Sequence, residues 1–383
     1  MTALGNEYEL PSTIAVTDHL EHSIAHHTWN YECRIRNWNP REEGTFVLTH
    51  IPDNYTEVKL TNLLLSSVNS ALVEDHVLAG VRLMVLTIVK SAIRSFKVKD
   101  NSRLTFLGLE YTYLNTLNFG VNSTIQVLKV DSSRLEQMPR SIATLSELVR
   151  LTITKSIIRA VNLDFMGGLK KLQFLDLSKN KINALYYRAQ PELYPVLRDV
   201  YLRGNKLQSI NTDLFNSMIA LHTLDLSHNQ ISVVSGSLKS SNLSFLDLSF
   251  NRIKKLDCCQ WVIPNIHNFI ISKNQLLKLP MCIESVFGNI TGFNVHHNQL
   301  HLDEMWKFAG MRYLTALKLS HNNLRHVTLN ADTLPPNLLF LDMSHNKVQQ
   351  LDLKYIPNER FLSGVAQGCK PFRLCFCKSL ATN

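Results

Sequence analysis

Residues 172–182 read Leu172-x-x-Leu175-x-Leu177-x-x-Asn180-x-Ile182, and residues 221–231 repeat the phrase as Leu221-x-x-Leu224-x-Leu226-x-x-Asn229-x-Ile231. Six more copies begin at residues 197, 243, 266, 290, 314 and 338, so that successive copies start 22 to 25 residues apart. Alternate side chains of a strand point to opposite faces, which turns Leu175 and Leu177 inward and Asp176 outward. One copy cannot bury its own leucines, so neighbouring copies must stack and enclose them. The phrase predicts a solenoid.

A weaker form of the phrase extends the array toward the N-terminus. Ser or Thr takes the place of asparagine in four copies, at Ser91, Thr112, Ser133 and Ser156, and a first copy begins at Tyr55. The period is that of leucine-rich repeats. The predicted fold class is therefore an α/β solenoid, a leucine-rich-repeat horseshoe of about 12–13 repeats with a parallel concave sheet. Its predicted parts are an N-terminal segment and cap (1–54), the repeat domain (55–356) and a cysteine-containing basic tail (357–383).

The asparagine of each copy lies where the strand turns away from the sheet. Its amide can bond the backbone donors and acceptors that the turn leaves unpaired. We expect an internal ladder formed by Asn180, Asn205, Asn229, Asn251, Asn274, Asn298, Asn322 and Asn346. The Ser and Thr hydroxyls upstream satisfy part of the same backbone.

Composition and motifs exclude several classes of function. The net charge of +9 over 383 residues is modest, and basic residues are scattered among acidic ones, so nucleic acid is not an expected partner. The longest apolar stretch, Val77 to Val89, is interrupted by Arg82, which predicts no membrane span. No phosphate loop, nucleophile elbow or metal motif is present. The sequence predicts a protein that is not an enzyme and holds no cofactor or metal.

Two of the seven cysteines occupy equivalent places in adjacent copies. Cys259 lies sixteen residues after Leu243, and Cys282 lies sixteen residues after Ile266. Equal offsets place the two Cα atoms about one strand spacing apart, within disulfide range. A Cys259–Cys282 bridge is predicted, with Cys258 as the alternative partner of Cys282 and buried free thiols as the other interpretation.

The expected compartment depends on which feature is weighed. Met1 to Ala15 has neither a basic start nor a long apolar stretch, which favours a cytosolic chain. The paired cysteines favour an oxidising compartment, and an extracellular location is predicted. N-x-S/T triplets at Asn54, Asn122, Asn242 and Asn289 are candidate glycosylation sites at repeat edges.

Beyond the repeat itself, several segments resemble the mosquito leucine-rich immune proteins over residues 30 to 355. They are Tyr31-Glu-Cys33, the degenerate early repeats, the Cys258-Cys259 repeat, and Gln299 to Met311 followed by LTALKLSHNNL. The resemblance implies a secreted innate-immune factor. It implies a complement-like thioester protein, a pathogen surface or another leucine-rich immune protein as partner. The chain departs from the family after Val348, where it lacks the Asn-Pro-Trp-x-Cys cap and heptads and carries Cys369, Cys375 and Cys377 instead.

Binding residues are sought at outward positions, since inward ones are committed to the core. The candidates for a protein partner are Tyr111, Phe174, Tyr201, Arg203, His228, Phe245, Phe250, His297, His321 and His345. The stretch from Tyr201 to Phe250 is the predicted partner-facing patch, and a glycan is the second class of ligand that such a face admits.

The last three histidines occupy equivalent positions in consecutive copies, with His296 beside the first. We expect them to stack along the concave edge and to titrate together at lowered pKa. A pH-dependent partner switch is one interpretation, and neutral surface histidines are the other. Two further functions stay open, an intracellular leucine-rich-repeat regulator of an enzyme and a truncated receptor ectodomain.

Overall fold

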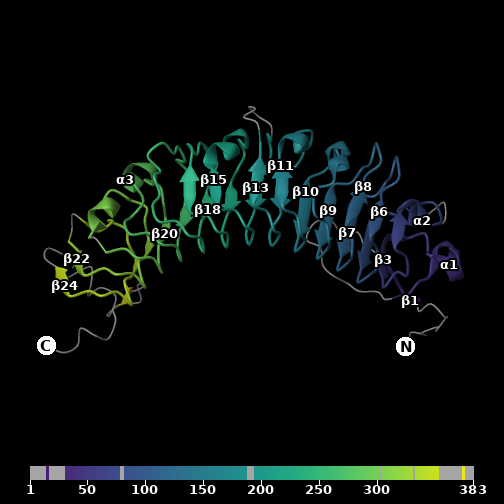
Figure 1. The fold of residues 1–383 in the computed structure, drawn as a ribbon, viewed down its shortest axis with the longest axis horizontal. Coiled ribbons are helices and arrows are strands. Elements are labelled where there is room, and N and C mark those ends of the chain that lie inside the picture. The colour runs from purple at the N-terminus through teal and green to yellow at the C-terminus, as the bar shows by residue number, and fades with distance from the viewer. Residues whose placement is uncertain are drawn as a thin grey trace, which may run out of the picture. The chain divides into compact units, whose positions relative to one another are not determined.

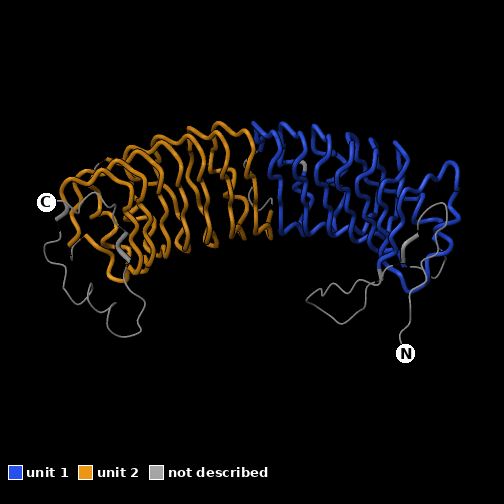
Figure 2. Tube along the Cα trace, turned by 90° about the horizontal axis from the view of Figure 1, so that it is seen from below, with its two compact units in different colours: residues 1–188 blue, residues 189–383 orange. Residues whose placement is uncertain are grey.

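A computed structural model of the chain describes residues 14–16, 31–77, 82–187, 194–301, 303–330, 333–352 and 373–375. The chain divides into two compact units, residues 1–188 and 189–383 (Figure 2). Each unit is built around a main sheet of short stacked strands. In unit 2, strands of this sheet lie side by side, and helix α3 (Ile283–Val286) lies away from them (Figure 1).

The main sheet of unit 1 follows chain order, and every pair after the antiparallel first one is parallel. Its strands are β1 (Ile14–Val16), β2 (Tyr31–Arg36), β3 (Tyr55–Thr61), β5 (Val85–Val89), β7 (Phe106–Glu110), β9 (Val127–Asp131), β10 (Arg150–Thr154) and β12 (Phe174–Asp176). Shorter parallel sheets join β4 (Ser67–Asn69), β6 (Ser95–Lys97) and β8 (Thr116–Asn118), and join β11 (Ala160–Asn162) to β13 (Ala184–Tyr186). The helical segments are α1 (Pro40–Glu43), η1 (Phe46–His50), α2 (Ala71–Glu74), η2 (Arg140–Thr144) and η3 (Asp164–Met166).

Unit 2 repeats this plan with a parallel main sheet. Its strands are β14 (Asp199–Tyr201), β16 (Thr223–Asp225), β18 (Phe245–Asp247), β19 (Asn268–Ile270), β20 (Gly292–Asn294), β21 (Ala316–Lys318), β23 (Phe340–Asp342) and β25 (Arg373–Cys375). The connecting segments hold β15 (Ser209–Asn211), η4 (Thr212–Ser217), β17 (Val233–Ser235), α3, η5 (Met305–Phe308), β22 (His326–Thr328) and β24 (Gln350–Asp352).

The solenoid prediction is confirmed, because every predicted repeat contributes a strand to a main sheet. Inward residues pair in phase, as where Leu224 lies opposite Leu246. The core is the column of these side chains, and both leucines are at most 1% exposed. The predicted N-terminal segment adds the strand β2, which the sequence analysis missed, and the tail adds β25 beside β23.

The asparagine ladder is also confirmed. Asn251 Nδ2 donates to the carbonyls of Leu226 and Leu248 at 3.1 and 3.0 Å, and its Oδ1 accepts from the Ile231 N–H at 2.9 Å. Each amide therefore satisfies backbone of its own repeat and of the preceding one. The same pattern of bonds recurs at Asn229, Asn274, Asn298, Asn322 and Asn346.

The Ser and Thr residues that take the ladder position in the N-terminal repeats differ in their hydrogen bonds. Ser91 Oγ accepts from the Leu63 N–H at 3.0 Å and donates to the Val89 carbonyl at 2.9 Å, as predicted. The prediction is wrong at Thr112, whose buried hydroxyl has no partner among the described residues. One hydroxyl can replace only some of the hydrogen bonds of an asparagine amide, because it has a single donor hydrogen and its side chain is shorter.

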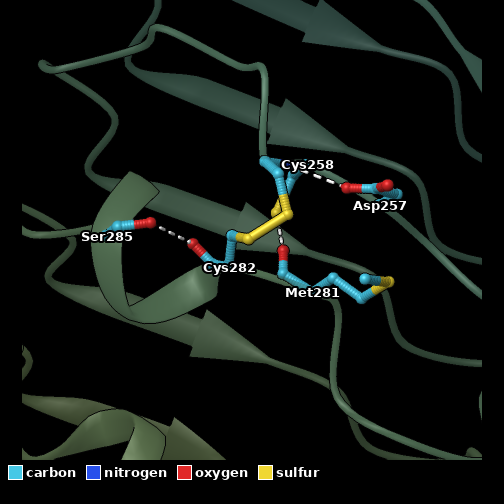
Figure 3. Close-up of a disulfide and its surroundings, with 6 residues drawn as sticks. Asp257, Cys258, Met281, Cys282 and Ser285 are labelled. Carbon is cyan, nitrogen blue, oxygen red and sulfur yellow. Dashed lines mark hydrogen bonds between the residues drawn. A yellow bond between two sulfur atoms is a disulfide. The ribbon is translucent and has the colours of Figure 1, made fainter.

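The predicted disulfide joins Cys259 and Cys282, whose Cα atoms are 5.0 Å apart (Figure 3). Asp257 Oδ1 accepts from the Cys259 N–H at 3.0 Å. The alternative partner, Cys258, is a buried free thiol that donates to the Met281 carbonyl at 2.7 Å, and burial, followed by the Asp257 charge, raises the pKa of this thiol to about 12.

The remaining cysteines are divided between the core and the tail. Cys33 is a free thiol on β2, where it fills the inward position opposite Val58, and burial raises its pKa to about 11. The predicted tail cysteines Cys369 and Cys377 lie outside the described residues.

Within the described part of the chain, every helix is too short or too polar to cross a lipid bilayer.

Candidate functional site

The residue before each ladder asparagine adopts a left-handed backbone. In unit 2 this holds for His228, Phe250, Lys273, His297, His321 and His345, with φ between 53° and 55°. Outside glycine, this conformation costs about 1–2 kcal/mol. The ladder bonds on either side hold it in place, and the same turn therefore recurs in every repeat. Equivalent side chains come to lie next to one another.

These side chains, together with Arg203, form what we call the stacked column. The His228 and Phe250 rings stack with centroids 3.9 Å apart and an interplanar angle of 15°. Arg203 Nη2 lies 3.2 Å from His228 Nε2, and Lys273 Nζ lies 4.4 Å from the centre of the Phe250 ring. Phe250 remains 39% exposed. The column thus offers an aromatic surface flanked by two cations.

The histidine part of the column continues the array, and its predicted stacking is confirmed. Ring centroids of His297 and His321 are 3.9 Å apart, and those of His321 and His345 are 4.1 Å apart. Burial, followed by the charges of His321 and Lys273, lowers the pKa of His297. Burial, followed by the His297 charge, lowers the pKa of His296 to about 4. The predicted direction of the shift is thus confirmed for these two side chains.

The other predicted binding residues divide between the units. Tyr201 and Phe245 are half-buried outward residues on β14 and β18 of unit 2. Phe174 belongs to unit 1, where Arg150 Cζ lies 3.9 Å from the centre of its ring. Tyr111 is 54% exposed in the same unit. Neither Phe174 nor Tyr111 is part of the stacked column.

All four predicted glycosylation asparagines are exposed, and each precedes a strand of a main sheet. Asn242 Nδ2 donates to the Ile219 carbonyl at 2.9 Å, and Asn289 Nδ2 donates to the Pro264 carbonyl at 2.8 Å. A glycosylated amide keeps one N–H, so the attachment is chemically compatible with these bonds. Their modification stays a prediction.

The sequence analysis missed a set of basic residues in the turns that follow the strands of unit 2. They lie one, three or four residues after the ladder asparagines from Asn251 onward, and all are exposed. We call this set the turn edge: Arg252, Lys254, Lys255, Lys278, Arg325 and Lys347. Reading the chain in steps of one repeat would have found it, because the residues recur at matching offsets.

No cluster suited to a metal ion occurs among the described residues. The stacked histidine rings are nearly parallel, within 13°. Metal ligation instead requires nitrogen lone pairs that converge on one point.

Comparison with known proteins agrees with this architecture. A family model described as leucine rich repeat matches residues 195–253. The structure of the LRIM1/APL1C complex has a TM-score of 0.54 and 19% identity, and the match covers 82% of this chain and 62% of that one. A leucine-rich-repeat protein from Bacteroides thetaiotaomicron gives a TM-score of 0.56 and 17% identity over 76% of this chain and 41% of its own. The chain is a leucine-rich-repeat solenoid.

Sequence relatives of this solenoid match shorter segments. Human lumican is 38% identical over 115 residues, which is 29% of this chain and 32% of lumican. Fibromodulin from Sus scrofa is 28% identical over 153 residues, which is 39% of this chain and 100% of the fibromodulin sequence compared. The match thus spans about a third of the length of lumican.

Proposed function

We propose that this solenoid is an extracellular, non-enzymatic protein that binds a protein partner on the sheet face of unit 2. The observation that carries the proposal is the stacked column, in which Arg203, His228 and Phe250 lie in contact on the solvent side. Arginine and large aromatic side chains supply much of the energy of protein interfaces. The left-handed turns fix these side chains before a partner arrives, so little entropy is lost on binding.

Two features support an extracellular location. The Cys259–Cys282 disulfide requires an oxidising environment to persist, which secreted proteins meet. The exposed Asn-x-Ser/Thr triplets are accessible to the glycosylation machinery of the secretory pathway. Thiol labelling of unreduced protein from its native source tests the location: we expect label on Cys33 and Cys258 after unfolding, and label on Cys259 and Cys282 would favour the intracellular regulator.

For the partner, we propose a complement-like thioester protein or a second leucine-rich immune protein. The first follows from the resemblance to mosquito leucine-rich immune proteins. The second is supported by the LRIM1/APL1C complex, in which two such named chains assemble with each other. A pathogen-surface glycan remains the second class of ligand.

The test measures binding of the full chain, secreted from insect cells, to each of these two candidate partners by surface plasmon resonance. Phe250→Ala and Arg203→Ala should each weaken binding at least about tenfold, because both truncate the column. The matched control is Tyr313→Ala, an aromatic side chain of unit 2 that is 59% exposed and outside the sheet. Wild-type protein that binds neither partner, or a control that weakens binding as much as Phe250→Ala, would contradict the proposal.

A further inference from the structure

The turn edge collects positive charge without acidic neighbours in the same positions. Across the described repeats of unit 2, the residues one, three and four places after each ladder asparagine include no Asp or Glu. Acidic side chains of the adjoining loops have other partners: Asp257 and Asp303 accept backbone N–H bonds. Glu304 accepts from the Leu279 N–H at 2.8 Å, next to Lys278, and forms an ion pair with Lys307. None of the six turn-edge residues forms an ion pair within the described part of the chain.

The turns stack in register, which lines these charges up along the solenoid. The Arg252 N–H donates to the Ile231 carbonyl of the preceding repeat at 2.8 Å. The Lys347 N–H donates to the Leu324 carbonyl of its preceding repeat at 3.1 Å. Equivalent turn positions therefore follow one another at roughly the strand spacing of 4.8 Å. The result is a row of cations along the turns after Asn251, Asn274, Asn322 and Asn346, interrupted at the turn after Asn298.

The disulfide stabilises the part of this edge where the charge is densest. Cys259 follows Lys255 by four residues, and Cys282 follows Lys278 by four. The Cys259–Cys282 bond therefore links the two loops that carry these lysines. Phe250 and Lys273 of the stacked column precede the ladder asparagines of these same two turns.

The candidate glycosylation sites leave this edge uncovered. Asn242 precedes β18 and Asn289 precedes β20, whereas the turn edge follows the strands. Because all main-sheet strands of unit 2 are parallel, their beginnings and ends lie on opposite edges of the sheet. Attached glycans would project from the edge that carries no member of this cationic set.

We propose that the turn edge binds a linear polyanion of the sulfated-glycan class. A chain of sulfate groups can contact successive repeats and displace their counterions together, which a compact anion cannot do. The turn-edge positions of unit 2 present no Phe, Tyr or Trp in the described repeats, so the large aromatic platforms that anchor single-stranded nucleic acid by base stacking are absent there. This inference goes beyond the proposed function, because it uses a different surface from the stacked column.

The test uses the full chain and a heparin oligosaccharide long enough to span several repeats. We expect binding at about 150 mM NaCl that weakens at least about tenfold as salt is raised, since counterion release drives it. The double variant Lys254→Ser/Lys255→Ser should bind about tenfold more weakly. The control variant Lys239→Ser/Arg312→Ser removes the same charge from exposed positions outside the turn edge and should change affinity by less than about twofold.

Equal weakening by the two double variants would show a response to net charge alone and would overturn the proposal. Absence of heparin binding would overturn it as well, and so would equally tight binding of desulfated heparin or of duplex DNA. If the variant Lys254→Ser/Lys255→Ser does not fold, heparin affinity is measured with a second turn-edge variant, Arg325→Ser/Lys347→Ser. Phe250→Ala should leave heparin binding unchanged, which separates this proposal from the proposed protein interface.

Discussion

At the scale of single residues, the solenoid depends on amides that bond backbone in two repeats at once. The buried side chain of Asn251 donates to the Leu226 and Leu248 carbonyls and accepts from the Ile231 N–H. These bonds also hold the left-handed residue before it, Phe250, which would otherwise favour another conformation. The amide that stabilises the core therefore also positions the ring proposed for binding.

Replacing Asn251 by Leu leaves the Ile231 N–H without its partner inside the core. It also removes one of the two amide donors from each of the Leu226 and Leu248 carbonyls, which Asn229 and Asn274 still serve. We expect the free energy of unfolding to fall by about 1–3 kcal/mol, measured by urea denaturation. Asn323→Leu is the control, since Asn323 follows a ladder asparagine without belonging to the ladder, and it should change stability by less than about 0.5 kcal/mol. Equal losses in both variants would show that the ladder has no special role.

The pKa of His296 predicts a pH dependence of stability. A folded-state pKa of about 4 lies below the ordinary value of about 6.5, so the unfolded chain binds the proton more readily. Stability is therefore fully present above pH of about 6.5 and is lost as pH falls toward about 4.

The variant His296→Ser, which copies Ser272 and Ser320 of the neighbouring repeats, should flatten this part of the profile. Thermal melts between these pH values provide the measurement, with His301→Ser as the control on an exposed histidine. A profile of His296→Ser that still follows the wild type would place the pH dependence elsewhere.

At the scale of elements, the loops opposite the main sheet are short helical turns and strands held by specific backbone geometry. Gly236, after β17, has a φ of 86°, and an added Cβ would lie 2.0 Å from Asn211 Oδ1. Asn211 in turn caps η4 by accepting from the Asp213 N–H at 3.0 Å. The Ser237 N–H donates to the Asp213 carboxylate, and this hydrogen bond links the two loops. The same bond lowers the pKa of the Asp213 carboxyl.

Gly236→Ala should lower the free energy of unfolding by about 1–3 kcal/mol, because it adds a left-handed strain and disturbs the η4 cap. Gly310→Ala is the matched control, since a Cβ there meets nothing within 4 Å. Denaturation of both variants in urea compares them directly. A Gly236→Ala variant as stable as Gly310→Ala would mean that the loop moves aside without cost.

At the scale of the whole molecule, unit 2 has chemically different strand-entry and strand-exit edges. Parallel strands bring the segments before β3 and β9 to one edge of unit 1, and those before β18 and β20 to one edge of unit 2. These segments carry the triplets headed by Asn54, Asn122, Asn242 and Asn289. In unit 2 the other edge carries the turn-edge cations.

Protein secreted from insect cells should therefore carry N-glycans on the entry edges, and their enzymatic removal should leave heparin affinity unchanged within about twofold. Mass spectrometry of glycopeptides and heparin titrations before and after removal provide the two measurements. Glycans that weaken heparin binding would show that the two edges are not separate.

Much of the fold and part of the candidate site could be predicted from the order of residues. The spacing of leucines and asparagines repeats along the chain. Its period alone therefore predicts which residues of the adjacent repeat lie beside Asn229, Leu224 and Cys259. The stacking of His297 on His321 follows from the same rule. The repeat spacing did not predict the core position of Cys33, because β2 carries no ladder asparagine that marks a repeat.

The sequence by itself determined the solenoid, the ladder and the disulfide, since each depends on an offset that recurs from repeat to repeat. Tertiary structure alone decided which cations share a surface, because Lys255 and Lys278 are separated along the chain and meet only when their turns stack. It also decided that Phe250 stacks on His228 beneath the charge of Lys273. Ring contacts of this kind depend on a left-handed backbone angle and on rotamers, which only the packed repeats hold in place.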